Sequence, residues 1–104
     1  RDAQQYHGQH LVICGGGDSA LDWAIDFAGK AASVTLIHRR AEFRAAPASV
    51  TRMRELEAAG QLKFIEGTIQ TLQSAEGTLT GATVKAADGT QPELHVDHVF
   101  AFFG

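Results

Sequence analysis

Cysteine is almost absent from this sequence, since Cys14 is the single cysteine among 104 residues. One cysteine cannot form a disulfide within the chain, which excludes a disulfide-stapled secreted scaffold and favours a reducing, cytoplasmic location. Apolar runs long enough to cross a bilayer as a helix are also absent, so we expect no membrane insertion. No signal peptide is visible. These absences favour a globular protein of the cytoplasm.

Internal repeats and low-complexity tracts are absent as well. At 104 residues the chain corresponds to one domain with a modest core. It does not begin with Met, and it ends directly after the apolar run 99–103, so we expect it to be part of a larger protein. Five of the nine Lys and Arg residues lie between Arg39 and Arg54, but Glu residues interleave with them and the net charge is −3. A nucleic-acid-binding module is therefore disfavoured.

The segment that organises the chain is rich in glycine. The apolar run Leu11–Cys14 predicts a buried strand, three consecutive glycines predict a tight turn, and an amphipathic helix follows from Asp18. Such a helix start offers free N–H groups and a partial positive charge to an anion. A merely structural tight turn is the alternative interpretation.

The glycines fit the pattern G-x-G-x-x-[GA]. Gly15 permits the sharp turn, Gly17 lets a pyrophosphate approach the backbone, and Ala20 lets the helix pack close to the strand. The sequence therefore predicts a nucleotide-binding turn. Its candidate residues are Gly15, Gly16, Gly17, Asp18, Ser19 and Ala20.

The remaining pattern predicts an α/β fold. Strands at 10–14, Ser33–Ile37 and Leu62–Ile65 alternate with helices, the second from Pro47 to before Gly60, which indicates a parallel sheet with right-handed crossovers. Short strand-like pieces then follow at 68–72, 79–86 and 92–96, separated by turn pairs typical of an antiparallel meander. The predicted fold is a Rossmann-like parallel sheet with helices on its faces and a small antiparallel β-meander.

The last apolar run, Val99–Phe103, predicts a strand buried on both faces that rejoins the parallel sheet beside the first strand. Ligands then bind where the first, second and last strands end, at the topological switch point. This arrangement places Gly15–Ser19, His38–Arg40 and the Phe103-Gly104 backbone around one crevice.

The end of the second predicted strand distinguishes NADP from NAD. An NAD site usually has Asp or Glu there for the ribose hydroxyl, whereas this chain has a basic cluster. Guanidinium groups match the oxygens of a 2′-phosphate bidentately. A solvated basic patch, partly compensated by Glu42, is the alternative. The candidate residues for NADP are His38, Arg39, Arg40 and Arg44.

These two motifs, residues 15–24 and 38–45, resemble those of the NADPH domain of thioredoxin-reductase-like flavoproteins, in the pyridine nucleotide-disulfide oxidoreductase superfamily. Within that superfamily the chain is most similar, over its whole length, to the thioredoxin-reductase-type ferredoxin–NADP reductases. The resemblance implies that residues 1–104 are an NADP(H)-binding domain of a larger, FAD-containing reductase. Hydride would pass from NADPH to FAD, and electrons would pass singly to ferredoxin or a similar carrier.

The same resemblance implies that the two cofactors bind to different domains of the parent protein. FAD is expected on another domain of the parent protein and not on this chain, so the isolated chain is expected to be inactive. We assign no catalytic residue and no metal ligand, and a homodimeric parent is left open. His7, His10, His95 and His98 lack metal-ligand spacing.

One departure separates the subfamilies. Thioredoxin reductases carry a Cys-x-x-Cys before the first strand of this domain, whereas residues 1–9 contain no cysteine. We therefore interpret Cys14 as a small buried hydrophobe.

Trp23 and Phe27 are expected to pack against a neighbouring element. Two alternatives stay open: a thioredoxin-reductase-like domain without its dithiol, and a non-catalytic dinucleotide-sensing module.

Overall fold

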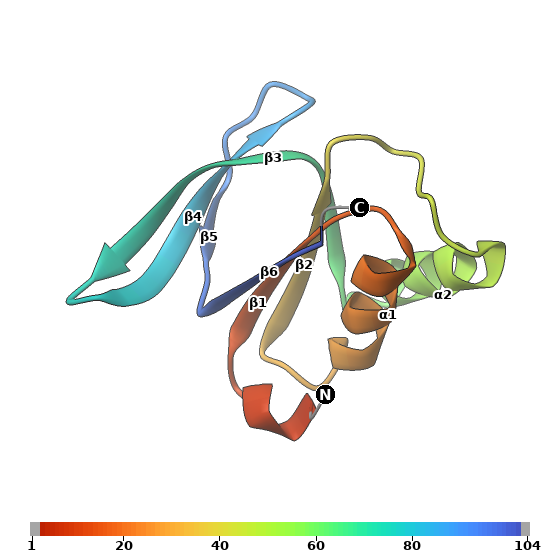
Figure 1. Ribbon diagram of the computed structural model, residues 1–104, viewed down its shortest axis with the longest axis horizontal. Coiled ribbons are helices and arrows are strands. Elements are labelled where there is room, and N and C mark those ends of the chain that lie inside the picture. The colour runs from red at the N-terminus through yellow and green to blue at the C-terminus, as the bar shows by residue number, and fades with distance from the viewer. Residues whose placement is uncertain (1–2, 103–104) are drawn as a thin grey trace.

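The computed structural model describes residues 3–102 and shows a six-stranded sheet in the order β5-β4-β3-β2-β1-β6 (Figure 1). The elements in chain order are η1 (Ala3–Tyr6), β1 (His10–Cys14), α1 (Asp18–Phe27), β2 (Ser33–His38), α2 (Pro47–Ala58), β3 (Lys63–Ala75), β4 (Thr78–Ala86), β5 (Glu93–His95) and β6 (His98–Ala101). The predicted α/β class, the alternation β1-α1-β2-α2-β3 and the antiparallel meander are confirmed.

The strands β3, β2, β1 and β6 run parallel, while β4 and β5 continue the sheet antiparallel from β3. The prediction that the last strand lies beside the first is confirmed. Cys14, the last residue of β1, is in register with Ile37 of β2 and Ala101 of β6. The carboxyl ends of these three strands therefore meet at one edge of the sheet.

Strand β3 differs from the expectation of two separate pieces, because it is continuous from Lys63 to Ala75. Its first part pairs with β2, and from Gly67 onward it pairs with β4. A Cβ at Gly67 would overlap the carbonyl oxygen of Lys85, so glycine allows the close approach of β4 there. One strand thus serves both the parallel and the antiparallel parts of the sheet.

Strand β6 is not buried on both faces, and that prediction was wrong. Val99 and Phe100 are half-buried and Ala101 is exposed. The reason is that β6 ends the strand order and has β1 as its sheet neighbour. Phe103, the last residue of the predicted strand, lies outside the described residues.

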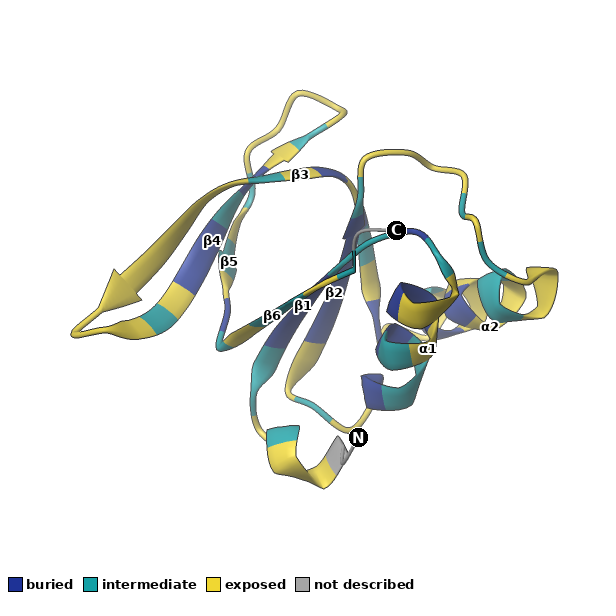
Figure 2. Cartoon of the chain, viewed as in Figure 1, coloured by how far each residue is buried: buried dark blue, intermediate teal, exposed yellow. Residues whose placement is uncertain are grey.

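The two helices pack on the same face of the sheet (Figures 1 and 2). Leu21, Ala24 and Phe27 of α1 form one core with Met53 and Leu56 of α2, packed on β1 and β2. Burying the larger of these side chains, those of Leu, Phe and Met, contributes about 1.5–3 kcal/mol each to the free energy of folding. Both helices predicted from the sequence are thereby confirmed.

The opposite face of the sheet carries a second core. Val12, Ile37 and Ile65 pack there against Ala82 and Val84 of β4. Successive residues of a strand point to opposite faces, which explains why Ile13 joins the first core while Val12 joins the second. The antiparallel part of the sheet thus covers the face that the helices leave open.

An aromatic cluster joins α1 to β6. The Phe27 ring lies 5.3 Å from the Tyr6 ring and 5.8 Å from the Phe100 ring, and the Trp23 ring lies 4.9 Å from Phe100. The neighbour expected for Trp23 and Phe27 therefore belongs to this chain.

Among residues 3–102, no helix is long and apolar enough to cross a membrane.

Candidate functional site

The turn after β1 depends on Gly15. Its φ of +144° lies outside the range that residues with a side chain adopt readily. A Cβ there would lie 2.8 Å from the carbonyl oxygen of Phe102 and 3.1 Å from the Cβ of Ala20. Gly15 and Ala20 therefore allow the helix, the turn and the end of β6 to approach one another, as the glycine pattern predicted.

Two backbone hydrogen bonds fix this turn between the neighbouring strands. The Gly15 N–H donates to the Ile37 carbonyl at 3.0 Å, and the Phe102 N–H donates to the Cys14 carbonyl at 2.9 Å. They hold the turn between the end of β2 and the segment after β6. The predicted convergence at the switch point is thus present, with Phe102 in the described structure, while Phe103 and Gly104 lie outside it.

The start of α1 is open toward this edge. Gly17 is the N-cap residue, and no side chain caps the first amides of the helix in the described chain. A Cβ at Gly17 would meet one neighbour within 4 Å, the Arg44 carbonyl oxygen at 3.9 Å. The N–H groups of the first turn are therefore available to an anionic ligand, and Gly17 leaves room for its approach.

The loop between β2 and α2 lies directly against the glycine turn. The Arg44 N–H donates to the Gly16 carbonyl at 2.6 Å, and Gly17 and Arg44 form an isolated parallel bridge. The Asp18 carboxylate accepts a hydrogen bond from the Ala46 N–H at 2.9 Å. This docking brings together the two predicted motifs. It also gives Asp18 a role that the sequence did not indicate, because its carboxylate binds the loop.

His38 lies across Gly16. A Cβ on Gly16 would overlap the His38 imidazole where it lies, so glycine lets that ring pack against the turn. The His38 ring also lies 5.6 Å from the ring of Phe43 in the loop. His38 therefore sits between the turn and the loop and contacts both.

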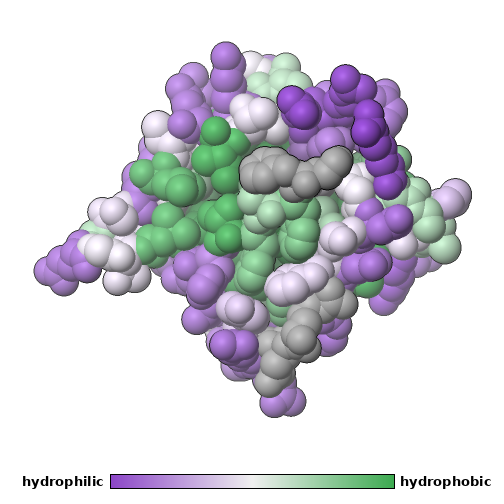
Figure 3. Space-filling view, in the orientation of Figure 1, coloured by the Kyte–Doolittle hydropathy of each residue, from purple (hydrophilic) through white to green (hydrophobic). Residues whose placement is uncertain are grey.

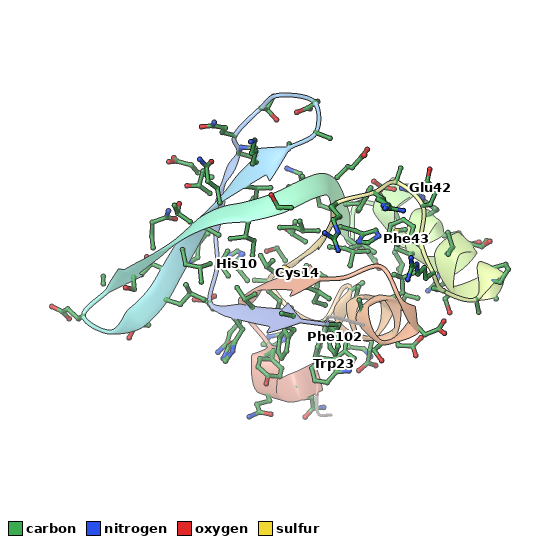
Figure 4. The ribbon with its side chains drawn as sticks, turned by 45° about the horizontal axis from the view of Figure 1, so that its top comes forward. His10, Cys14, Trp23, Glu42, Phe43 and Phe102 are labelled. Atoms are coloured by element: carbon green, nitrogen blue, oxygen red, sulfur yellow. The ribbon has the colours of Figure 1, made fainter. Side chains whose placement is uncertain are left out.

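The arginines of this loop carry uncompensated charge. Arg39, Arg40 and Arg44 are exposed, and within residues 3–102 their side chains form no ion pair. Glu42, expected to compensate them in part, is exposed and likewise unpaired among the described residues. Figure 4 shows Glu42 and Phe43 on this loop, close to α2. A ligand with a multiply charged phosphate is the kind of partner that such a cluster attracts.

A pocket of about 540 Å³ opens beside the turn. Its wall combines the turn and the end of β2 with residues from β3 and β6, namely Cys14, Gly15, Ile37, His38, Arg39, Gly67, Thr68, Ile69, Val99, Ala101 and Phe102. The hydrophobic surface in the middle of Figure 3 lies on the same face as the second core. Sequence reasoning missed the β3 residues, because the pairing of β3 with two different partners is not visible in local periodicity.

Cys14 is half-buried at the wall of this pocket, and not fully buried as the sequence suggested. It is the last residue of β1, where the strand leaves the core and its side chain borders the pocket. Burial still raises the pKa of the Cys14 thiol above its ordinary value. A raised pKa keeps the thiol protonated at neutral pH, and the protonated form is a poor nucleophile.

We accordingly expect Cys14 to react several-fold more slowly with a thiol reagent in the native chain than in denaturant at pH 7.5. The native rate should rise with pH beyond the ordinary range of cysteine, because the thiolate forms late. The measurement is the time course of labelling followed by mass. Equal rates in the native and denatured chain would show that the Cys14 thiol is not protected from the reagent and that its pKa is not raised.

Unlike His38, the histidines His10 and His95 lie away from this edge. The His10 ring, at the amino end of β1, lies 4.6 Å from the His95 ring, and its Nδ1 lies 2.8 Å from Ser33 Oγ. In the part of the chain that the structure describes, no three His, Cys, Asp or Glu side chains are grouped to hold a metal ion.

The sheet order, the helix-covered face and the glycine turn at the strand ends define an α/β domain with the thioredoxin-reductase-like fold. The chain belongs to the pyridine nucleotide-disulphide oxidoreductase family, whose profile matches residues 1–104. The resemblance drawn from the two motifs is therefore confirmed.

Named relatives refine this placement. The chain is 51% identical over 104 residues to ferredoxin–NADP reductase 2 of Cupriavidus pinatubonensis, covering 100% of the chain and 28% of that protein. It is 45% identical over 104 residues to the ferredoxin–NADP reductase of Nitrobacter winogradskyi, covering 100% of the chain and 30% of that protein. The chain thus spans less than a third of the length of these relatives.

Solved structures agree with the fold. The thioredoxin reductase of Streptococcus pyogenes superposes with a TM-score of 0.82 at 27% identity, over 99% of this chain and 33% of that one. The thioredoxin reductase of Lactococcus lactis superposes with a TM-score of 0.84 at 25% identity, over 99% of this chain and 34% of that one.

Proposed function

We propose that this chain is the NADP(H)-binding domain of a flavoprotein reductase of the ferredoxin–NADP reductase type. The observation that carries the proposal is the docking of the arginine-bearing loop on the glycine turn, through Arg44 and Gly16 and through Ala46 and Asp18. It presents an open helix start, and arginines that form no ion pair within residues 3–102, at the same edge of the sheet. A pyrophosphate and a 2′-phosphate are the two anionic groups that distinguish NADP from most other ligands.

The residues present fit this cofactor. The amides at the start of α1, beside Gly17 and Ser19, would hold the pyrophosphate, since no side chain caps them within the described residues. Arg39 and Arg40, with Arg44 and His38 beside them, would hold the 2′-phosphate. NADPH supplies a hydride when bound, and this chain's own residues bind and orient the cofactor. We assign no proton transfer to any residue of the chain.

The rest of the proposed reaction lies in the parent protein. The flavin is proposed on a separate FAD-binding domain of the same protein, and the electron acceptor is proposed to be ferredoxin or a similar carrier. The names of the relatives at 51% and 45% identity, ferredoxin–NADP reductases, support ferredoxin as the acceptor. A cytoplasmic location is proposed because the sequence offers a single cysteine and hence no internal disulfide.

A thioredoxin-reductase-like activity is the second candidate, and the superposed thioredoxin reductases favour it at the level of the fold. Disulfide reduction by a dithiol needs two cysteines, and Cys14 is the one cysteine in this sequence. This candidate therefore requires its dithiol elsewhere in the parent protein.

The expected result for the chain alone is that it binds NADP⁺ at least about tenfold more tightly than NAD⁺ and retains no flavin. Calorimetric titration with both nucleotides measures the first part. Incubation with FAD, followed by gel filtration and an absorbance spectrum, measures the second. Stoichiometric yellow protein would show that the glycine turn binds FAD, and equal affinity for the two nucleotides would contradict the NADP assignment.

A further inference from the structure

The loop that carries the arginines, residues 39–46, has little regular structure and few buried side chains. Phe43 and Ala45 are its half-buried residues, whereas the other six positions are exposed. Both half-buried side chains pack against the core between the helices and the sheet. Phe43 is by far the larger of the two, so its packing is the main apolar anchor of the loop.

Phe43 lies in a continuous stack of side chains. On one side its ring lies 5.6 Å from His38, which in turn lies over Gly16 of the turn. On the other side it lies 5.1 Å from Phe64 of β3, edge to face. The stack thus connects the glycine turn to the start of β3.

Arg54 of α2 covers this stack from outside. Its guanidinium carbon lies 5.4 Å from the centroid of the Phe43 ring and 5.2 Å from that of Phe64. Both distances are within the range of a cation–π interaction. Its Nη1 also donates to Glu57 Oε1 at 3.1 Å, so the guanidinium contacts the rings and this carboxylate at the same time. Nothing in the sequence pattern predicts this contact of Arg54 with the two rings.

We propose that Arg54 is a positioning residue for NADP selectivity: it holds Phe43 in place, and Phe43 holds the arginine-bearing loop against the glycine turn. The inference rests on the proposed function, because it concerns how the same site selects the 2′-phosphate. Arg54 itself does not contact the ligand in this scheme. Its effect is to keep the loop in the position that binds, so that little ordering is needed when the ligand arrives.

The chain offers a matched control on the same helix. Arg52 is also an exposed arginine that pairs with a glutamate three residues later, with Nη1 3.5 Å from Glu55 Oε1. The two side chains are 58% and 43% exposed for Arg52 and Arg54. No cation–π contact involves Arg52 among the described residues. Replacing either arginine by methionine removes the same charge and a similar ion pair.

The experiment titrates 2′-phospho-AMP and AMP into the chain and its variants. Arg54→Met is expected to lower the ratio of the two affinities about threefold to tenfold, while Arg52→Met leaves it unchanged. AMP is the internal reference, because a general loss of structure weakens both ligands equally. Arg54→Lys, which keeps a cation, should recover part of the ratio.

Phe43→Leu should lower the ratio to a similar extent, and the double variant Phe43→Leu/Arg54→Met should be no worse than either single variant. Suppose that the wild-type chain prefers 2′-phospho-AMP and that Arg54→Met lowers this preference no more than Arg52→Met does. That result would overturn this inference and leave the proposed function intact. A wild-type chain with no such preference would overturn both.

Discussion

Replacing Arg39 and Arg40 together by alanine is expected to abolish most of the preference of the chain for 2′-phospho-AMP over AMP. Hydrogen bonds to charged groups contribute roughly 1.5–3 kcal/mol each, and 1.4 kcal/mol is about tenfold in affinity. Each arginine should therefore raise the affinity for 2′-phospho-AMP by about tenfold to a hundredfold. The lower end is expected because both side chains are exposed. Calorimetric titration of both ligands measures the effect.

Several controls sharpen this prediction. The affinity for AMP should change little, apart from any stacking of a guanidinium on the adenine ring. Arg52→Ala/Lys30→Ala removes the same charge outside the loop and outside the pocket wall, and should leave the preference intact. Arg44→Ala should have a smaller effect, because the Arg44 contact with the turn is made by its backbone N–H. Added salt should weaken binding of 2′-phospho-AMP in the wild-type chain. A double variant that keeps its preference would refute the assignment of the 2′-phosphate site.

The parts of this fold that could be predicted are those with local signals. The apolar run before the glycines, the β-branched run Ser33–Ile37 and the proline at the start of α2 each specify an element by themselves. The order of these elements then limits the topology, because a parallel crossover between neighbouring strands is almost always right-handed. The usual strand order of a doubly wound sheet predicts the position of β6 beside β1.

The parts that could not be predicted depend on contacts between residues distant in sequence. Nothing local reveals that the Asp18 carboxylate binds the Ala46 N–H, 28 residues later. Periodicity places Arg54 on the outer face of α2, which is correct for its backbone, but a long side chain can lie along the surface and cover an aromatic ring. The burial of β6 was overestimated because an apolar sequence does not tell a central strand from an edge strand.

Two glycines of the turn after β1 are needed for different reasons, so replacing each by alanine should have different effects on stability and on binding. Gly15→Ala is expected to destabilise the fold by roughly 2–6 kcal/mol, since it adds backbone strain to overpacking against Phe102 and Ala20. Gly17→Ala should stay within about 1 kcal/mol of the wild type, a common cost for alanine at an N-cap. Gly17 has an ordinary φ of −96°, and a Cβ there has open space. Thermal unfolding measures both effects.

The affinity for NADP⁺ should fall more for Gly17→Ala than for Gly15→Ala, which is the reverse of their effects on stability. The titration is made at a temperature where both variants are folded. A methyl group on Gly17 would occupy the space through which the pyrophosphate approaches the start of α1. Overpacking of about 1–3 kcal/mol corresponds to a loss of roughly fivefold to 150-fold in affinity. Gly17→Ala therefore combines a nearly normal melting temperature with strongly weakened binding. A Gly17→Ala chain that binds NADP⁺ as tightly as the wild type would mean that the pyrophosphate does not lie at this helix start, and the assignment of Gly17, Asp18 and Ser19 to the site would be lost.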